Sequence, residues 1–214
     1  VDTRKGTELT GLDVRTGEPA TVSSAAVFPA KSVASGRDWA KAVRAAVILA
    51  ANANAVAALS NVEPFPRLEL DGVELTARGA RYLKLLEIVD QTFTIHDLSG
   101  PLGLPTFAFS TPQGTVAYTS DLDVALALEQ GLERTLLAYQ AQAADQPAYA
   151  PEPVPDLPAN LRGELGTWPS SVSLDEVVAR LTRDGGRVVA VPLDHDPAIA
   201  QLCPFVVTAV VVNG

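Results

Sequence analysis

Cysteine and histidine are scarce in this sequence of 214 residues, which contains one cysteine, Cys203, and two histidines. A single cysteine excludes a disulfide within the chain and any metal site built from several thiolates. His96 and His195 are too few for a histidine-rich zinc site. The sequence therefore provides neither a disulfide framework nor a zinc centre of the cysteine-rich or histidine-rich kind.

Basic residues are also few, since 16 Lys and Arg stand against 25 Asp and Glu and leave a formal net charge of −9. Nucleic acids and anionic membranes attract proteins through a basic face. We therefore expect neither as a partner. The opening residues, VDTRKGTELTG, lack the charged and then apolar pattern of a signal peptide, so we expect a cytoplasmic location.

One long apolar run, residues 39–59, predicts the central helix of the fold, with Asp38 as its N-cap. Beyond Arg44 its only polar side chains are Asn52 and Asn54. Such a helix is buried on most of its faces, so we expect both asparagines in the core. A membrane span is the alternative, because about 18 apolar residues are enough to cross a bilayer. Weakly apolar alanines, the two asparagines and the absence of basic flanking loops favour a core helix.

Helical and strand patterns alternate along the rest of the chain. Residues 1–31 contain short strand-like runs between glycine turns and predict a hairpin or a meander. Helical spacing predicts helices at 75–89, 124–144 and 174–183. Ser120 or Asp121 is the expected cap of the helix 124–144. Strands are predicted at 92–98, 106–110, 115–119, 187–192 and 205–212. The pattern indicates an α+β fold, a mainly antiparallel sheet packed against long helices.

The sequence divides into three predicted parts. Residues 1–144 form the core, with the helices 39–59 and 124–144. Residues 145–172 are rich in proline and predict a linker or an extended surface loop, which we expect to be the preferred site of limited proteolysis. Residues 173–214 add a helix and strands that complete the same sheet.

Three small groups of residues could carry chemistry. The glycine pair 185–186 resembles a phosphate loop, but no Lys-Ser/Thr follows, so it predicts a helix end. The run Asp-His-Asp at 194–196 could bind a metal or act as an acid and base, and a solvated turn is the alternative. Cys203 with His96 and Asp97 could form a nucleophile and its base, and a buried inert thiol is the alternative. None of these groups has a signature that identifies an active site.

Five stretches occur in an order that is typical of one family. They are Ser-Val-Ala-Ser-Gly at 32–36, the apolar helix at 42–56, His-Asp-Leu-Ser at 96–99 with Leu-Gly-Leu-Pro at 102–105, the helix at 120–142, and the closing strands at 185–193 and 204–214. In this order they resemble the YcaO family, whose members use ATP to activate peptide backbone amides and form azolines or thioamides. The resemblance implies the α+β core of that family.

The carboxylates that hold magnesium and ATP in the family are not matched here. The family's helix carries Glu-x-x-Glu-Arg-Asp-Ala, and the corresponding residues are Leu49, Asn52, Ala53, Asn54 and Ala55. Leucine and alanine cannot ligate magnesium, which favours carboxylate oxygen, and asparagine ligates it only weakly. The resemblance therefore implies that ATP chemistry is lost, and we expect no cofactor, with ATP and magnesium as the alternative.

Four residues are the candidates for a remnant of the nucleotide site. Asn52 and Asn54 lie on the helix that resembles the ATP-site helix. Glu129 and Glu133 lie on the later helix, where Arg134 occupies the position of a family glutamate. The alternative for the two glutamates is a solvent-exposed pair one helical turn apart. No residue is predicted to be catalytic or to ligate a metal.

The resemblance leads to one expected function and two alternatives. We expect a non-catalytic binding or scaffold partner in ribosomal peptide modification, which binds a modifying enzyme or a precursor peptide. The alternatives are an ATP-dependent enzyme completed by another chain and a small-molecule-binding domain. The family's Ser-x-x-x-Glu-x-x-Glu-Arg segment and its proline-rich end have no counterpart here. We therefore expect a homodimer that covers exposed surface through an unpaired edge of the strand 205–212.

Overall fold

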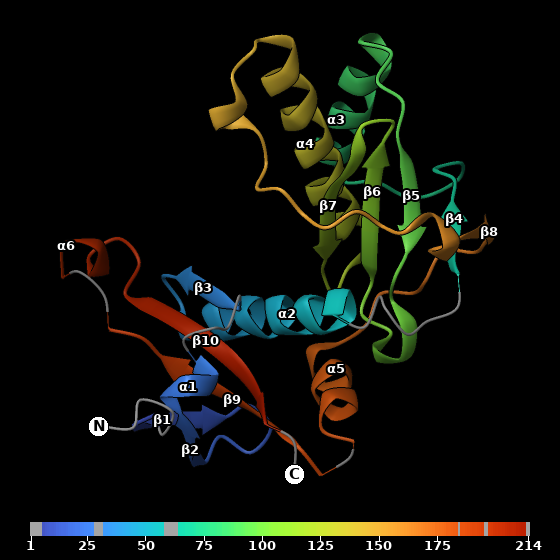
Figure 1. The fold of residues 1–214 in the computed structure, drawn as a ribbon. Helices are drawn as coiled ribbons and strands as arrows, with labels where there is room; N and C mark the ends of the chain where they lie inside the picture. The colour runs from blue at the N-terminus through green and yellow to red at the C-terminus, as the bar shows by residue number, and fades with distance from the viewer. Residues whose placement is uncertain (1–5, 28–31, 58–63, 184, 195–196, 213–214) are drawn as a thin grey trace. The chain divides into compact units, whose positions relative to one another are not determined.

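The computed structural model describes residues 6–27, 32–57, 64–183, 185–194 and 197–212 (Figure 1). The chain forms two compact units, one made of Val1–Asn54 with Ser173–Gly214 and the other of Ala55–Val172. The first unit thus combines the two ends of the sequence. The predicted core of residues 1–144 is divided between these two units, and the C-terminal strands pair with the N-terminal ones.

The first unit contains an antiparallel sheet of five strands in the order β2-β1-β9-β10-β3. The strands are β1 Glu8–Asp13, β2 Pro19–Ser23, β3 Val33–Gly36, β9 Arg187–Pro192 and β10 Phe205–Val212. The two predicted C-terminal strands are confirmed, with the predicted bounds. They complete a sheet with the N-terminal strands β1 to β3, because β9 pairs with β1 and β10 pairs with both β9 and β3. The prediction of an unpaired edge at β10 is therefore wrong.

The apolar pattern of β10 explains its central place. Val207 and Ala209 pack toward the helix α2, Trp39–Ala57, whereas Val210 packs on the opposite face with Val22 and Val27. Val27 ends the short helix α1, Ser24–Val27. A strand that is apolar on both faces requires cover on both faces, and α2 on one side and α1 on the other contribute this cover.

The helix α2 covers one face of this first sheet. It begins after Asp38, whose Oδ1 accepts a hydrogen bond from the Lys41 backbone N–H at 3.1 Å. Its buried side chains recur at helical spacing and are mostly alanine, so the helix packs closely on the strands: Ala42, Val43, Ala46, Val47 and Ala50. By length and composition alone α2 could also cross a membrane. One face of α2 packs on the sheet, as predicted for a core helix.

The second unit contains a sheet of five strands in the order β7-β6-β5-β4-β8. The strands are β4 Phe65–Leu68, β5 Thr94–Asp97, β6 Thr106–Thr111, β7 Gly114–Ser120 and β8 Arg162–Leu165. All pairs are antiparallel except β4 with β8. The mainly antiparallel α+β architecture is confirmed, in two sheets instead of one.

Two long helices, α3 Ala77–Ile88 and α4 Val124–Ala143, lie side by side on one face of the second sheet (Figure 1). They cover Ile95, Phe107 and Phe109, which are fully or almost fully buried. Asp123 caps α4 by accepting from two backbone N–H groups, so neither Ser120 nor Asp121 is the cap. The third predicted helix is α5, Leu174–Leu181, and the chain also forms a short helix α6, Pro197–Ala200.

The proline-rich segment crosses the other face of the second sheet before it reaches β8 (Figure 1). Thr115 Oγ1 accepts from the Leu157 backbone N–H at 2.7 Å, and Trp168 Nε1 donates to the Glu69 carbonyl at 2.9 Å. Leu157 is buried in a cluster with Phe65. Of the two predicted alternatives, a linker or an extended surface loop, the contacts of residues 155–172 favour an extended segment that side chains anchor to the sheet.

Proteolysis within residues 145–172 is expected to start at Tyr149. This side chain is 71% exposed, and residues 146–150 are all exposed. Chymotrypsin should therefore cut after Tyr149 before it cuts after Leu161, which is buried and is not followed by a proline. Mass spectrometry of early digests measures the order. A first cut in this segment at Leu161 would contradict the described packing.

Candidate functional site

The positions of α2 that the sequence resemblance matches with ATP-site residues carry no carboxylate. Leu49, Ala53 and Asn54 are exposed, and Asn52 is half-buried. The last fully buried residue of α2 is Ala51. The expectation that both asparagines lie in the core is thus wrong for Asn54, because the apolar run in the sequence is longer than the buried face of the helix.

Glu129 and Glu133 of α4 face α3 and are held by its residues. Thr76 Oγ1 donates to Glu129 Oε2, and Arg78 bridges both carboxylates at 3.3 Å from Nη1 to Glu129 and 3.3 Å from Nη2 to Glu133. Tyr82 donates its hydroxyl to Glu133 Oε1 at 2.9 Å. The side chain of Glu129 is only 14% exposed. The alternative of a solvent-exposed glutamate pair is therefore wrong for Glu129.

This cluster links the two helices and suits a structural role. Arg78 also donates to the Tyr82 hydroxyl at 2.8 Å and lies over its ring, 5.7 Å from the centroid. A guanidinium between two carboxylates neutralises their charge, and a hard cation would have to displace it. The two glutamates are therefore poor magnesium ligands in this arrangement. The sequence carried a signal for the cluster, the spacing Arg78-x-x-x-Tyr82, which places both side chains on one helix face.

Metal-binding groups do not gather elsewhere in the part of the chain that the structure describes. Within it, no three His, Cys, Asp or Glu side chains are grouped so that they could hold a metal ion. Of the predicted cluster at 194–196, only Asp194 lies within the residues that the structure describes. The glycine pair at 185–186 follows the end of α5, and Gly185 has a positive φ of 80°, which confirms a helix stop.

The three residues considered as a nucleophile with its base are placed separately. His96 and Asp97 are consecutive in β5 and so point to opposite faces of the sheet. Cys203 belongs to the first unit and is half-buried. Asp97 accepts from the Ser99 hydroxyl and from the Ser99 backbone N–H. Burial raises the pKa of Asp97, and the Ser99 hydrogen bonds oppose that shift. Asp97 thus orders the loop that follows β5.

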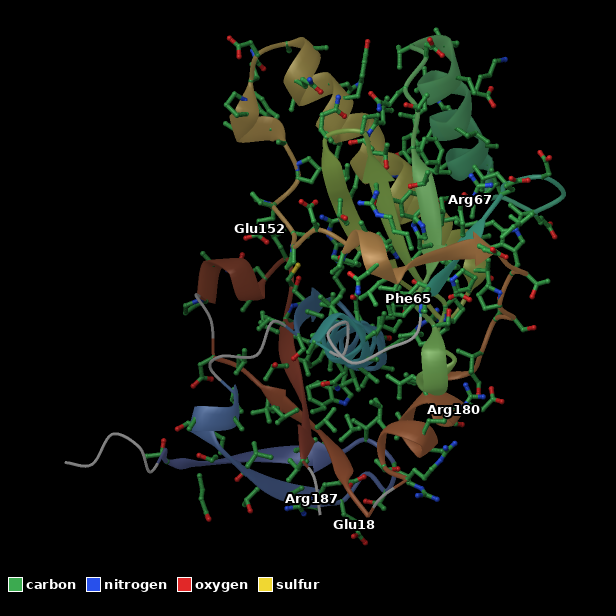
Figure 2. All side chains as sticks on the ribbon, turned by 45° about the vertical axis from the view of Figure 1, so that its right-hand side comes forward. Glu18, Phe65, Arg67, Glu152, Arg180 and Arg187 are labelled. Atoms are coloured by element: carbon green, nitrogen blue, oxygen red, sulfur yellow. The ribbon has the colours of Figure 1, made fainter. Side chains whose placement is uncertain are left out.

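His96 is the most unusual polar residue of the second sheet. It is 2% exposed, and its Nδ1 is buried without a hydrogen-bond partner among the described residues. In the strand register it lies opposite Arg67 of β4, which is labelled in Figure 2. Burial and then the positive charges of Arg162 and Arg67 lower the pKa of His96. The imidazole is therefore held neutral, and its unpaired nitrogen is a cost that packing elsewhere must offset.

The sheet face around His96 is basic at one edge and covered by the proline-rich segment. Tyr118 donates to the Pro155 carbonyl at 2.9 Å, and Arg162 donates to the Leu157 carbonyl at 3.2 Å. Burial raises the pKa of Tyr118. Sequence analysis missed Arg67 and Arg162, because only the pairing of β4 with β5 and β8 places them on the face of His96.

A cavity of about 440 Å³ lies between the β6–β7 turn, the C-terminal half of α4 and the proline-rich segment. Its lining includes Tyr139 and the carboxylates Asp145, Glu152 and Asp156, and no residue of α2. Glu152 lies on the segment that follows α4 (Figure 2). An apolar pocket lined by the central helix would favour the small-molecule-binding alternative, and this cavity is not such a pocket.

Solved structures resemble this arrangement over almost the whole chain. A structure described as a heterocyclase in complex with substrate and cofactor aligns with a TM-score of 0.66 at 15% identity, covering 96% of this chain and 32% of that chain. The heterocyclase TruD aligns with a TM-score of 0.61 at 13% identity, covering 97% of this chain and 34% of its own. Both are YcaO-type heterocyclases.

The fold is YcaO-like.

A third YcaO-type structure supports this finding. A chain of the E. coli microcin synthetase McbBCD complex, solved with pro-MccB17 bound, aligns with a TM-score of 0.59 at 9% identity, covering 97% of this chain and 64% of its own. No protein-family model matches the sequence, and no curated protein matches it. The chain spans about a third of the length of the first two heterocyclases. At these identities the likeness concerns the YcaO-like fold alone.

Proposed function

We propose that this chain is a non-catalytic, cytoplasmic YcaO-like domain that binds a modifying enzyme or a precursor peptide in ribosomal peptide modification. The observation that carries the proposal is the fold, which aligns with heterocyclases over 96% and 97% of the chain. One of these structures is described as a complex with substrate, and the McbBCD structure contains pro-MccB17. A domain with this fold is therefore suited to a place beside a peptide.

The side chains support a role without ATP chemistry. Leu49, Asn52, Ala53 and Asn54 stand where the resemblance places the ATP-site residues, and none of them is charged. Glu129 and Glu133 are paired with Arg78. A triphosphate with magnesium needs several oxygen ligands around the metal, and carboxylates are the usual protein contribution. These residues do not fit magnesium-ATP, so we infer that peptide or protein binding is the retained function.

Isothermal titration of magnesium-ATP into the purified chain is expected to give no binding heat, and phosphate release is expected to stay at the background rate. An ATP-hydrolysing heterocyclase measured in the same buffer is the positive control. Saturable heat or magnesium-dependent hydrolysis would contradict the non-catalytic role. That result would support the alternative of an enzyme completed by another chain.

Partner binding needs a separate measurement. The precursor peptide and the modifying enzyme encoded nearest to the gene of this chain are the probes. Fluorescence polarisation with the peptide and size-exclusion chromatography with the enzyme are expected to show a complex with one of them. Failure of both would overturn the proposed function even if ATP does not bind.

We also propose a homodimer, although β10 is not the unpaired edge strand from which we first expected it. The outer strands of the first sheet are β2 and β3, not β10. The edges of β2 and β3 are therefore the strand edges that a second copy could pair with in this sheet. Sedimentation of the 22.4 kDa chain at two concentrations a factor of about ten apart measures the oligomeric state directly.

A further inference from the structure

The cavity of about 440 Å³ beside α4 has an acidic lining. Asp145, Glu152 and Asp156 contribute three carboxylates, and none of the described residues that line it is Lys, Arg or His, so the lining has a formal charge of −3. No described residue forms an ion pair with any of the three. Arg162 contacts the proline-rich segment, but it donates to the Leu157 carbonyl and lies outside the lining. The charge of the cavity is therefore not compensated by its own residues.

The end of α4 adds to the negative potential of the cavity. Ala138, Tyr139, Ala141 and Gln142 belong to the last two turns of α4, and Asp145 follows just after the helix. A helix C-terminus carries about half a negative elementary charge and is stabilised by a nearby cation. The last turn of α4 has no basic residue that could supply this cation. The helix end and the carboxylates therefore favour the same kind of ligand, one with positive charge.

The carboxylates are spread around the cavity and do not converge on one point. Among the described residues, no three Asp, Glu, His or Cys side chains are grouped closely enough to hold a metal ion. Asp145 lies at the end of α4, whereas Asp156 and Glu152, which is labelled in Figure 2, lie along the proline-rich segment. One small ion therefore cannot contact all three carboxylates. Several ammonium groups that are joined by a flexible chain can do so.

The remaining lining suits the methylene groups of such a chain. Val116, Ala138 and Pro151 contribute apolar surface, and Tyr139 contributes a half-buried aromatic side chain. Aromatic rings attract ammonium groups through the negative face of the ring. The volume falls within the range of about 300–1,000 Å³ that is typical of small-molecule sites. Size, apolar walls and charge thus all fit an aliphatic polycation.

Hydrogen bonds hold both ends of the cavity wall in place. Asp156 Oδ1 accepts from the Thr115 backbone N–H at 2.7 Å. At the other end, the Gln146 backbone N–H donates to the Ala141 carbonyl at 2.8 Å. A wall that is already ordered reduces the entropy that a ligand must lose on binding.

We propose that this cavity binds a ligand with two or more ammonium groups on a methylene chain, the chemistry of an aliphatic polyamine. The ammonium groups pair with Asp145, Glu152 and the second oxygen of Asp156, and the methylenes lie on Ala138 and Tyr139. Lysine side chains carry the same chemistry, so a basic peptide is the other source of such a ligand. A second copy of the chain is disfavoured, because its net charge is −9. The inference does not depend on the proposed role in peptide modification.

Isothermal titration of spermidine into the full chain tests the proposal. Saturable binding at one site is expected, with a dissociation constant below about 1 mM at about 20 mM salt, and it should weaken as salt is added. Butylamine, which carries one ammonium group, is expected to bind at least about tenfold more weakly. A capped peptide with three lysines is titrated in the same buffer. The tighter of the two polycations identifies the source of the natural ligand.

Neutral substitutions locate the binding site. Glu152→Gln and Asp145→Asn are each expected to weaken spermidine about threefold to fivefold, because each removes one exposed ion pair. Asparagine tolerates the positive φ of 52° at position 145, so that substitution changes the charge and not the backbone. Glu74→Gln is the matched control, since Glu74 is exposed and lies outside the lining. It is expected to leave the affinity within about twofold of the original.

A substitution that keeps the charge tests whether the cavity itself is used. Gln142 is exposed in the lining, and Gln142→Trp is expected to fill part of the cavity and to weaken spermidine at least about fivefold. Thermal unfolding of each variant is expected to show a retained fold, as is usual for exposed side chains.

Three outcomes would overturn the proposal. The first is binding of neither spermidine nor the lysine peptide. The second is an equal loss of affinity in Glu74→Gln and Glu152→Gln, because spermidine would then bind the acidic surface at large. The third is full affinity after Gln142→Trp, which would place the ligand outside the cavity.

Discussion

Replacing Gly131 with alanine is expected to lower the free energy of unfolding of the second unit by about 2 kcal/mol or more. Gly131 is buried in the middle of α4. A Cβ at this position would lie 1.9 Å from Phe109 Cε2, far inside the van der Waals separation of about 3.5 Å. Phe109 cannot simply move away, because it is fully buried and its ring stacks on Phe93 with centroids 6.2 Å apart.

Helix propensity alone predicts the opposite sign. Alanine is favoured over glycine by about 1 kcal/mol in a helix interior. Overpacking of a core costs about 1–3 kcal/mol and more when the backbone must shift. Packing is therefore expected to outweigh propensity at Gly131, and α4 would have to move away from β6 to admit the methyl group.

Urea unfolding of the variants measures this balance. Gly79→Ala is the matched control, because Gly79 is also a buried helical glycine, yet its Cβ would lie 3.2 Å from Thr76 Oγ1 and 3.6 Å from the Glu129 Cα. Its effect is expected to stay within about 1 kcal/mol. Gly131→Ala combined with Phe109→Leu is expected to recover part of the loss. A stabilised Gly131→Ala chain would contradict the described packing of α4 on β6.

Lowering the pH is expected to destabilise the second unit through His96. Burial and two nearby arginines lower the pKa of His96 in the folded state, whereas an unfolded histidine titrates near about 6.5. Below that pH the unfolded chain binds a proton that the folded chain excludes. The stability contribution is therefore complete above about pH 6.5 and is lost as the pH falls toward the folded pKa. The limiting slope for one proton is about 1.4 kcal/mol per pH unit.

Comparison with His96→Gln isolates this contribution. The variant keeps a polar side chain but cannot titrate, so its unfolding free energy is expected to fall less steeply between about pH 7 and pH 5. Asp97 acts in the opposite sense in both chains, because burial raises its pKa. Chemical denaturation at several pH values gives the two slopes. Parallel slopes would show that His96 is not held neutral by its surroundings.

Much of the local structure was predictable because its signals are local. Strand residues alternate or remain apolar over a few positions, and the strands 187–192 and 205–212 are found with the predicted bounds. Turn residues act within their own turn, as Gly114 does with its φ of 139° at the start of β7. The α+β class and the YcaO-like fold followed from such elements and from their order along the chain.

The sequence by itself thus determined the long helices and the longer strands, and only the tertiary structure decided which of them are partners. The sequence of one strand does not specify which strand it pairs with. The pairing of β10 with β9 and β3 and the division into two sheets therefore could not be inferred. Side-chain environments depend on elements distant in sequence in the same way. Arg78 of α3 pairs with Glu129 and Glu133 of α4, and burial and then the arginines of β4 and β8 lower the pKa of His96. These contacts join residues tens of positions apart, and only the folded chain brings their charges within range of one another.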